Sequence, residues 1–103
     1  MAVSKEVFDN AISIFSCMGD LTITRKGKYA VGKIQKGTLK VKNKITCFYP
    51  EKDITCVIKR IESLNQLKRK FANEGEIVAL KIKGKNIEQI KENDIFIIPG
   101  ANL

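Results

Sequence analysis

The most constraining feature of this sequence is an alternation of apolar and polar residues that begins at Leu21 and continues almost to the end of the chain. A period of two is the pattern of a β-strand with one buried and one solvated face. Turn-forming residues divide the alternation into short stretches, and we predict strands over residues 21–24, 29–35, 38–42, 45–48, 54–58, 76–82 and 94–98. At least six short strands separated by turns indicate an all-β fold, a small closed antiparallel Greek-key β-barrel.

The segments between these strands are predicted to be short connections. Residues 64–73 are charged and weakly periodic, which predicts a loop with at most a helical turn. Gly84 is predicted to open a turn, and residues 87–92 to form one helical turn before the last strand. The triplet Ile-Thr-Cys occurs at residues 45–47 and again at 54–56, which predicts two arms of one hairpin.

The N-terminal segment has a different period. Apolar residues fall at helical spacing over residues 3–18, with Ser4 as the predicted N-cap and Gly19 as the stop. We therefore predict an N-terminal amphipathic helix in residues 1–19 and a barrel domain in residues 20–103. Two roles stay open for this helix: packing on the barrel, or docking on a partner protein.

Composition narrows the function classes. The 103 residues suffice for one domain and include no His, which excludes Ser-His-Asp and Cys-His catalysis and His-dependent zinc sites. The three cysteines, Cys17, Cys47 and Cys56, are odd in number and form no C-x-x-C pair, so we expect core thiols in a reducing cytoplasm. No signal peptide and no apolar run of about 20 residues are present, so no membrane span is predicted.

Several segments resemble a known family in their order and spacing. They are Gly32–Gly37 (GKIQKG), Leu39–Asn43 (LKVKN), Ile61–Leu64 (IESL), Gly75–Leu80 (GEIVAL) and the closing Pro99-Gly100. From Leu21 to Gly100 the chain resembles the second domain, a β-barrel, of translational GTPases such as elongation factor Tu.

The sequence lacks the nucleotide-binding motifs of that family. There is no G-x-x-x-x-G-K-[ST] phosphate loop, and residues 43–46 (NKIT) lack the acid of the guanine-reading N-K-x-D motif. We therefore expect the barrel alone, with no bound nucleotide, no cofactor and no enzymatic activity.

The resemblance also places the pocket that holds the aminoacylated 3′ end of tRNA in elongation factor Tu. The acidic residue that meets the terminal adenosine falls on Glu62 and is retained, although a solvated acid at a strand end is an equally good interpretation. Other pocket positions differ in residue type: Met18 and Gly19 replace an acidic pair, Leu21 an aromatic residue, Val31 a threonine, Asn65 a basic residue and Ile77 an asparagine. Polar recognition of an α-amino group is thus expected to be lost to an apolar surface.

Positive charge is concentrated in one stretch of the sequence. No acidic residue occurs between Asp20 and Glu51, whereas this interval holds eight cations: Arg25, Lys26, Lys28, Lys33, Lys36, Lys40, Lys42 and Lys44. Alternation predicts a common face for Lys40 and Lys42. A second group surrounds Glu62: Lys59, Arg60, Lys68, Arg69 and Lys70. Tyr49, beside Pro50, is the best candidate to stack on an exposed base, whereas Phe48 is predicted to face the core.

Two functions are compatible with a net charge of +8. The first is contact with an RNA backbone, ribosomal RNA or tRNA, through the basic stretch, Glu62 and the 59–70 group. The second is a protein-interaction module, in which the barrel and its helix dock on a protein partner and the charge serves solubility. The location of the lysines should separate them, because RNA contact needs one contiguous basic face.

Overall fold

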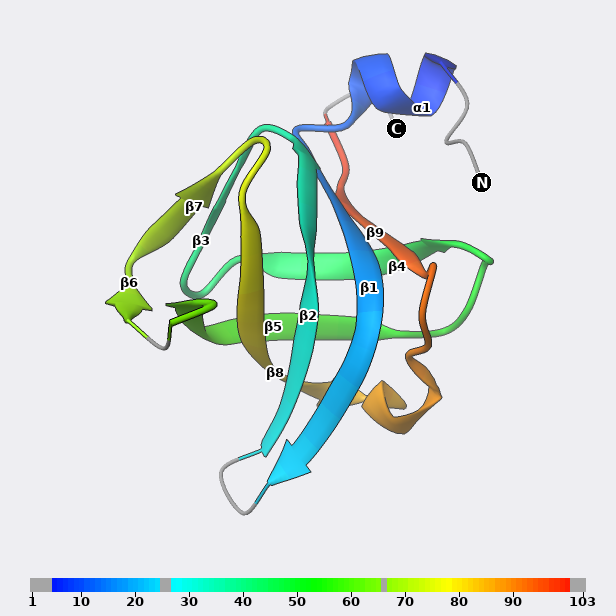
Figure 1. Ribbon diagram of the computed structural model, residues 1–103. Coiled ribbons are helices and arrows are strands. Elements are labelled where there is room, and N and C mark those ends of the chain that lie inside the picture. Colours follow the sequence, from blue (N-terminus) through cyan, green and yellow to red (C-terminus); the bar gives the residue numbers. More distant parts are fainter. Residues whose placement is uncertain (1–4, 25–26, 66, 101–103) are drawn as a thin grey trace.

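The computed structural model describes residues 5–24, 27–65 and 67–100 (Figure 1). This part of the chain contains one α-helix, one 3-10 helix and nine β-strands. The elements are α1 (Lys5–Asn10), β1 (Ser13–Thr24), β2 (Gly27–Lys36), β3 (Thr38–Lys40), β4 (Lys44–Tyr49), β5 (Thr55–Ser63), β6 (Lys68–Arg69), β7 (Phe71–Asn73), β8 (Ile77–Lys85), η1 (Ile87–Gln89) and β9 (Ile95–Ile98).

Six strands form a closed antiparallel barrel, which confirms the predicted all-β fold. They follow one another in the order β4-β9-β1-β2-β8-β5, and pairing of β5 with β4 closes the ring. The two-residue strand β6 pairs with the end of β5, while β3 and β7 form a separate two-stranded sheet. Figure 1 shows α1 above one end of the barrel and the β1–β2 hairpin extending from the other.

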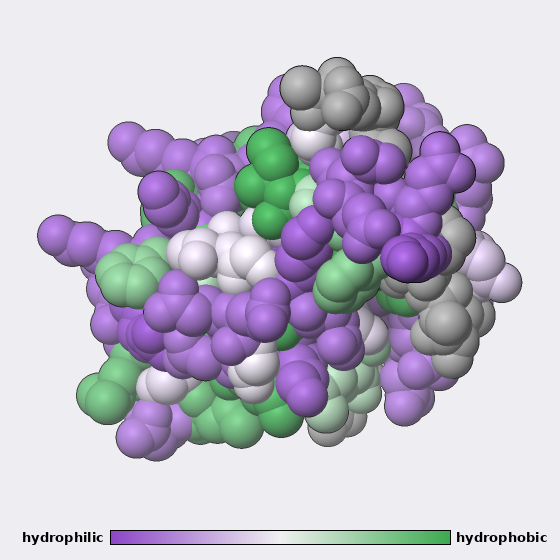
Figure 2. Space-filling model, turned by 90° about the horizontal axis from the view of Figure 1, so that it is seen from above, coloured by the Kyte–Doolittle hydropathy of each residue, from purple (hydrophilic) through white to green (hydrophobic). Residues whose placement is uncertain are grey.

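Inward-facing side chains from all six barrel strands fill the interior, among them Phe15, Ile34 and Leu80. Gly32 lets β1 and β2 approach closely, since a Cβ atom there would lie 2.3 Å from the Ser16 carbonyl oxygen. Seen from above, the outer surface is largely hydrophilic, with apolar side chains in separate patches (Figure 2).

The predicted helix over residues 3–18 is wrong beyond Asn10. Ser13 begins β1, which pairs with β2 on one side and with β9 on the other, so residues 13–19 belong to the barrel sheet. Phe15 lies in the main core. Ile14 points to the opposite side of the strand, where it is fully buried in a second cluster that includes Ala11, the residue after α1. Because both faces of the strand are covered here, apolar residues lose the period of two, and such a run cannot be distinguished from a helix by pattern alone. The predicted N-cap, Ser4, lies outside the described residues.

Other element boundaries also differ from the prediction. The connector predicted over residues 64–73 contains the short strands β6 and β7, and the last helical turn is limited to η1. Gly84 does not open a turn but lies within β8, opposite Cys56 of β5. A Cβ atom at Gly84 would lie 2.3 Å from the Thr55 carbonyl oxygen, so glycine is needed for the close approach of two strands.

Candidate nucleic-acid interface

The strand β8 presents three lysines on the outside of the barrel. Val78, Leu80 and Ile82 are buried, and the alternation of a strand therefore directs Lys81, Lys83 and Lys85 outward. The prediction that the strand ends at residue 82 missed this row, although the alternation in the sequence already directs Lys81 and Lys83 to one side.

Neighbouring strands place further cations beside this row. Lys81 pairs with Tyr29 of β2 and with Arg60 of β5, while Lys83 pairs with Val57, which in turn pairs with Lys44 of β4. Side chains directly opposite each other in antiparallel strands lie about 5 Å apart at their Cβ atoms. We define the basic face as the outward cations of β2, β8, β5, β4 and β6: Lys33, Lys44, Arg60, Lys68, Lys81, Lys83 and Lys85.

Glu62 lies among the cations of the basic face and contacts its central residues. Its Oε2 atom is 3.3 Å from Arg60 Nε, and its β6 partner in the ladder is Lys68. Burial and then a hydrogen bond to Glu62 raise the pKa of Tyr29, because the neutral phenol can donate to the carboxylate. Tyr29 is thus a half-buried ring held among cations, which makes it a better stacking surface beside this face than the predicted Tyr49.

The positions of the aminoacyl-end pocket come together on this outer surface. Val31 pairs with Ala79, and Ala79 pairs with Glu62, so the three lie on one line across β2, β8 and β5. Ile77 points outward two residues before Ala79, and Gly19 of β1 is the other partner of Val31.

The surroundings of Glu62 are accordingly apolar on one side. Met18 and Ile77 are exposed, and Asn65 is exposed and accepts a hydrogen bond from Ser63 Oγ. The side chain of Leu21 lies outside the described residues. The structure therefore brings Glu62, Val31 and Ile77 onto one surface, where apolar side chains replace the polar pocket positions while Arg60 and Tyr29 contact the acid.

Several predicted cations do not reach the basic face. Lys28 is buried, with 4% of its surface exposed, and its Nζ atom donates to the Ile87 carbonyl oxygen. Burial lowers the pKa of Lys28, because the charged ammonium group is held away from water. The prediction that Lys28 is an RNA-contacting residue is therefore wrong. Lys28 lies on the same inward-facing side of β2 as Ala30 and Ile34.

Two further predicted cations are engaged by other parts of the chain. Lys36 Nζ donates to the carbonyl oxygens of Phe8 at 2.5 Å and Asp9 at 3.1 Å, at the C-terminal end of α1, and lies 5.3 Å from the centroid of the Phe8 ring. Arg69 forms a two-point ion pair with Glu76. Lys36 and Arg69 therefore interact with oxygen atoms of this chain, which leaves less of their positive charge available to a ligand.

The remaining predicted residues lie elsewhere on the surface. Lys40 is the last residue of β3 and pairs with Phe71, while Lys42 follows in a turn with a φ of 79°, so the predicted common strand face of these two lysines does not form. Lys70 lies close by, because its carbonyl oxygen accepts from Val41 N. Arg25 and Lys26 lie outside the described residues. Tyr49 lies at the end of β4 next to β9, away from β8.

The three thiols are core residues, as predicted. Cys17, Cys47 and Cys56 all lie in the main interior cluster, where burial raises the pKa of each, to about 11 for Cys47 and about 12 for Cys56. Such thiols are weak nucleophiles and poor metal ligands at neutral pH. The two Ile-Thr-Cys arms do form one hairpin, with Ile45 rather than Cys47 opposite Cys56.

The described part of the chain offers neither a metal site nor a membrane-spanning helix. Within residues 5–24, 27–65 and 67–100 no group of three or more His, Cys, Asp and Glu side chains could hold a metal ion. In the same ranges no helix is long and apolar enough to pass through a bilayer.

Comparison with known proteins identifies the fold. No family model matches the sequence. Among solved structures, translation elongation factor SelB from Methanococcus maripaludis superposes with a TM-score of 0.71 at 17% identity, covering 88% of this chain and 18% of that one. A bacterial selenocysteine-specific elongation factor, EF-Sec, gives 0.68 at 15% identity, covering 94% and 16%. Sup35 complexed with GMPPNP gives 0.70 at 16%, covering 94% and 22%. The chain thus spans about a fifth of these proteins, and it has the fold of a translation-factor β-barrel like the second domain of elongation factor Tu.

Proposed function

We propose that this chain is a non-catalytic, translation-related cytoplasmic module that contacts RNA, ribosomal RNA or the tRNA backbone, through the basic face. The observation that carries the proposal is the row formed by Lys81, Lys83 and Lys85, three successive outward positions of one strand. Arg60 and Lys44 flank this row on the adjoining strand β5 and its neighbour β4. The barrel fold shared with translation elongation factors supports a ribosome or tRNA as the partner.

The chemistry of the face suits phosphates better than base edges. Most of its cations are lysines, which act as compact point charges, whereas bidentate reading of guanine is mainly the work of arginine. Each phosphate that a lysine neutralises releases condensed counterions, so the affinity should fall steeply with salt. Tyr29 supplies an aromatic ring that borders the basic face in the ladder, and it can stack on an unpaired base.

Binding of bulk tRNA to two matched variants tests the proposal. The first variant, Lys81→Glu/Lys83→Glu/Lys85→Glu, reverses the β8 row, and the second, Lys40→Glu/Lys42→Glu/Lys70→Glu, reverses three lysines around β3 and β7. Both variants lower the net charge equally. We expect the first to reduce the slope of log affinity against log salt by about 2 to 3, measured between about 50 and 200 mM salt, and the second to reduce it by less than about 1.

Equal losses in the two variants would contradict the proposal, because they would show that net charge alone attracts tRNA. Absence of binding by the wild type at low salt would also exclude it, since nonspecific electrostatic attraction is strongest there. In either case a protein partner becomes the better explanation of the fold, and the charge serves solubility.

A further inference from the structure

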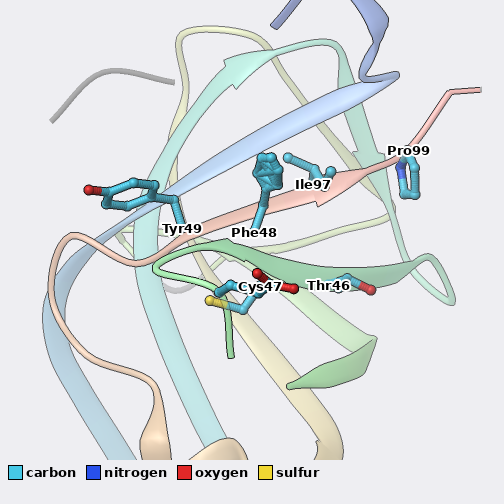
Figure 3. Close-up of a pocket in the computed structure, with 7 residues that line it drawn as sticks. Thr46, Cys47, Phe48, Tyr49, Ile97 and Pro99 are labelled. Carbon is cyan, nitrogen blue, oxygen red and sulfur yellow. The ribbon is translucent and has the colours of Figure 1, made fainter. Parts of the chain in front are cut away.

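A second candidate site lies on the other side of the barrel, on the outer surface of β4 and β9. The pocket has a volume of about 510 Å³, and its walls include Thr46, Phe48, Tyr49, Glu51, Ile97 and Pro99 (Figure 3). This volume falls within the usual range for ligand pockets, roughly 300 to 1,000 Å³. In the strand order, β9 is three strands from β8, so the pocket and the centre of the basic face point in opposite directions.

A β-bulge brings two adjacent aromatic residues to the pocket. Cys47 pairs with Phe96 and Tyr49 with Ile95, so Phe48 is one extra residue in β4. Without the bulge, simple alternation would direct Tyr49 inward with Cys47. Instead Cys47 is buried, Phe48 is half-buried and Tyr49 is 45% exposed, and Figure 3 shows both rings on the pocket side of the strand. The prediction that Phe48 faces the core is wrong, because alternation with the buried Ile45 and Cys47 directs Phe48 outward, where it packs in the outer cluster with Ile14 and Ile97.

The walls of the pocket are firmly held by the surrounding sheet. Phe48 and Ile97 belong to the apolar cluster that α1 covers from one side, so the pocket is the uncovered continuation of a packed surface. The strand β4 is paired with β5 on one edge and with β9 on the other. A ligand therefore cannot add to β4 as a further strand, and it must bind through its side chains.

The pocket carries one uncompensated charge. Glu51 is exposed and has no hydrogen bond or ion pair among the described residues, although the protein has a net charge of +8. The adjacent Lys52 does not neutralise it, because Lys52 Nζ is bound to Asp94 Oδ2 at 2.9 Å and to the Gln89 carbonyl oxygen at 3.0 Å. A free carboxylate beside an exposed tyrosine ring suits a cationic group that can both pair with the acid and stack on the ring.

We propose that this pocket binds an extended peptide segment of a partner protein in which an arginine lies next to proline or aliphatic residues. The apolar side chains occupy the space between Phe48, Ile97 and Pro99, as in other aromatic-lined peptide grooves. The guanidinium group pairs with Glu51 and stacks on Tyr49, a combination that arginine provides better than lysine. The site does not depend on the proposed RNA contact, since it shares none of the basic-face residues.

Selection of a phage-displayed random heptapeptide library on the immobilised full chain tests the site without a known ligand. We expect enriched peptides to contain an arginine beside proline or aliphatic residues. A fluorescein-labelled copy of the leading peptide is then titrated against the variants. Glu51→Lys should weaken binding roughly tenfold, through loss of one ion pair and gain of repulsion, and Tyr49→Ala about fivefold.

Asp53→Lys is the matched control, because it makes the same charge change in the same loop at a residue that does not line the pocket. It should change the affinity less than about twofold. Acid-rich enriched peptides, no enrichment, or equal losses in Glu51→Lys and Asp53→Lys would overturn the proposal. The peptide titration contains no nucleic acid, and the Lys81→Glu/Lys83→Glu/Lys85→Glu variant should bind the peptide normally, so failure here is distinct from failure of the RNA proposal.

Discussion

Two lysine-rich segments of this protein, residues 25–44 and 81–85, differ in where the fold places their positive charges. Residues 25–44 hold eight cations in 20 residues, yet their described part, residues 27–44, includes all or part of three strands and two connections. Their charges are distributed to the interior at Lys28, to the end of α1 at Lys36, to the β3–β7 sheet and to the basic face. Residues 81–85 hold only three cations, but all three lie on one strand at a period of two and share its outer side.

The difference shows that the density of charge along a sequence does not determine its density on a surface. In a barrel, a local run of cations on consecutive elements is divided among strands that face different directions. Cations spaced by two within one strand stay together, and the neighbouring strands add others from distant parts of the sequence, as Lys44 and Arg60 do here.

The largest effect should come from breaking the strand that aligns the second segment. Gly84→Ala places a Cβ atom 2.3 Å from the Thr55 carbonyl oxygen and 2.8 Å from the Cys56 Cα atom, so β5 and β8 must separate. We expect a loss of about 2 to 3 kcal/mol in the free energy of unfolding. Urea denaturation measures it.

Gly75→Ala serves as the comparison for that variant. Gly75 has a φ of +88° but open space around it, so only backbone strain of about 1 kcal/mol is expected. If Gly84→Ala unfolded at the same urea concentration as the wild type, the close contact of β5 with β8 would be refuted.

A smaller effect should separate single lysines of the two segments. Lys83→Met removes one outward charge of the basic face, and we expect the salt slope of tRNA binding to fall by about 1. Lys36→Met removes a charge that already caps α1, and the slope should stay unchanged. A reversed ranking, measured by fluorescence anisotropy across the same salt series, would favour the 25–44 stretch as the contact surface.

Lys28→Met should leave tRNA binding unchanged and alter only the pH dependence of stability. Burial lowers the pKa of Lys28 in the folded protein below its ordinary 10.5. Between these two pKa values the unfolded chain binds more protons, so the stability of the wild type relative to Lys28→Met should rise with pH. Urea midpoints of both proteins at several pH values up to about 10 provide the measurement, and a flat difference would mean that the amine is not desolvated.

The smallest effect concerns Arg69, whose charge Glu76 compensates. The Arg69 side chain and then the Asn73 backbone amide lower the pKa of Glu76 below its ordinary 4.5. The stabilisation by this pair should therefore be present above about pH 4.5 and disappear as the pH falls through the lowered value. Glu76→Gln should lose stability relative to the wild type at about pH 6 but not in acid.

The pattern of the sequence predicts the barrel well because most strands bury only one face. It fails at β1, where α1 and β9 bury Ile14 on the outer side and remove the polar half of the alternation. The buried position of Lys28 was within reach of the pattern, since it has the parity of Ala30 and Ile34, and so was the outward row of β8. The bulge at Phe48 was not, because one inserted residue reverses the parity of the next positions in the strand without any mark in the sequence.

The contact of Lys36 with α1 has a consequence for the order of folding. A helix of six residues without a buried side chain has too few hydrogen bonds to persist in isolation. Two of its carbonyl groups, those of Phe8 and Asp9, accept hydrogen bonds from Lys36 at the end of β2, which is positioned there by its pairing with Ile14 of β1. Although α1 precedes all nine described strands in the chain, we expect it to become ordered only after the sheet has assembled, so its helical signal should appear in the last phase of refolding.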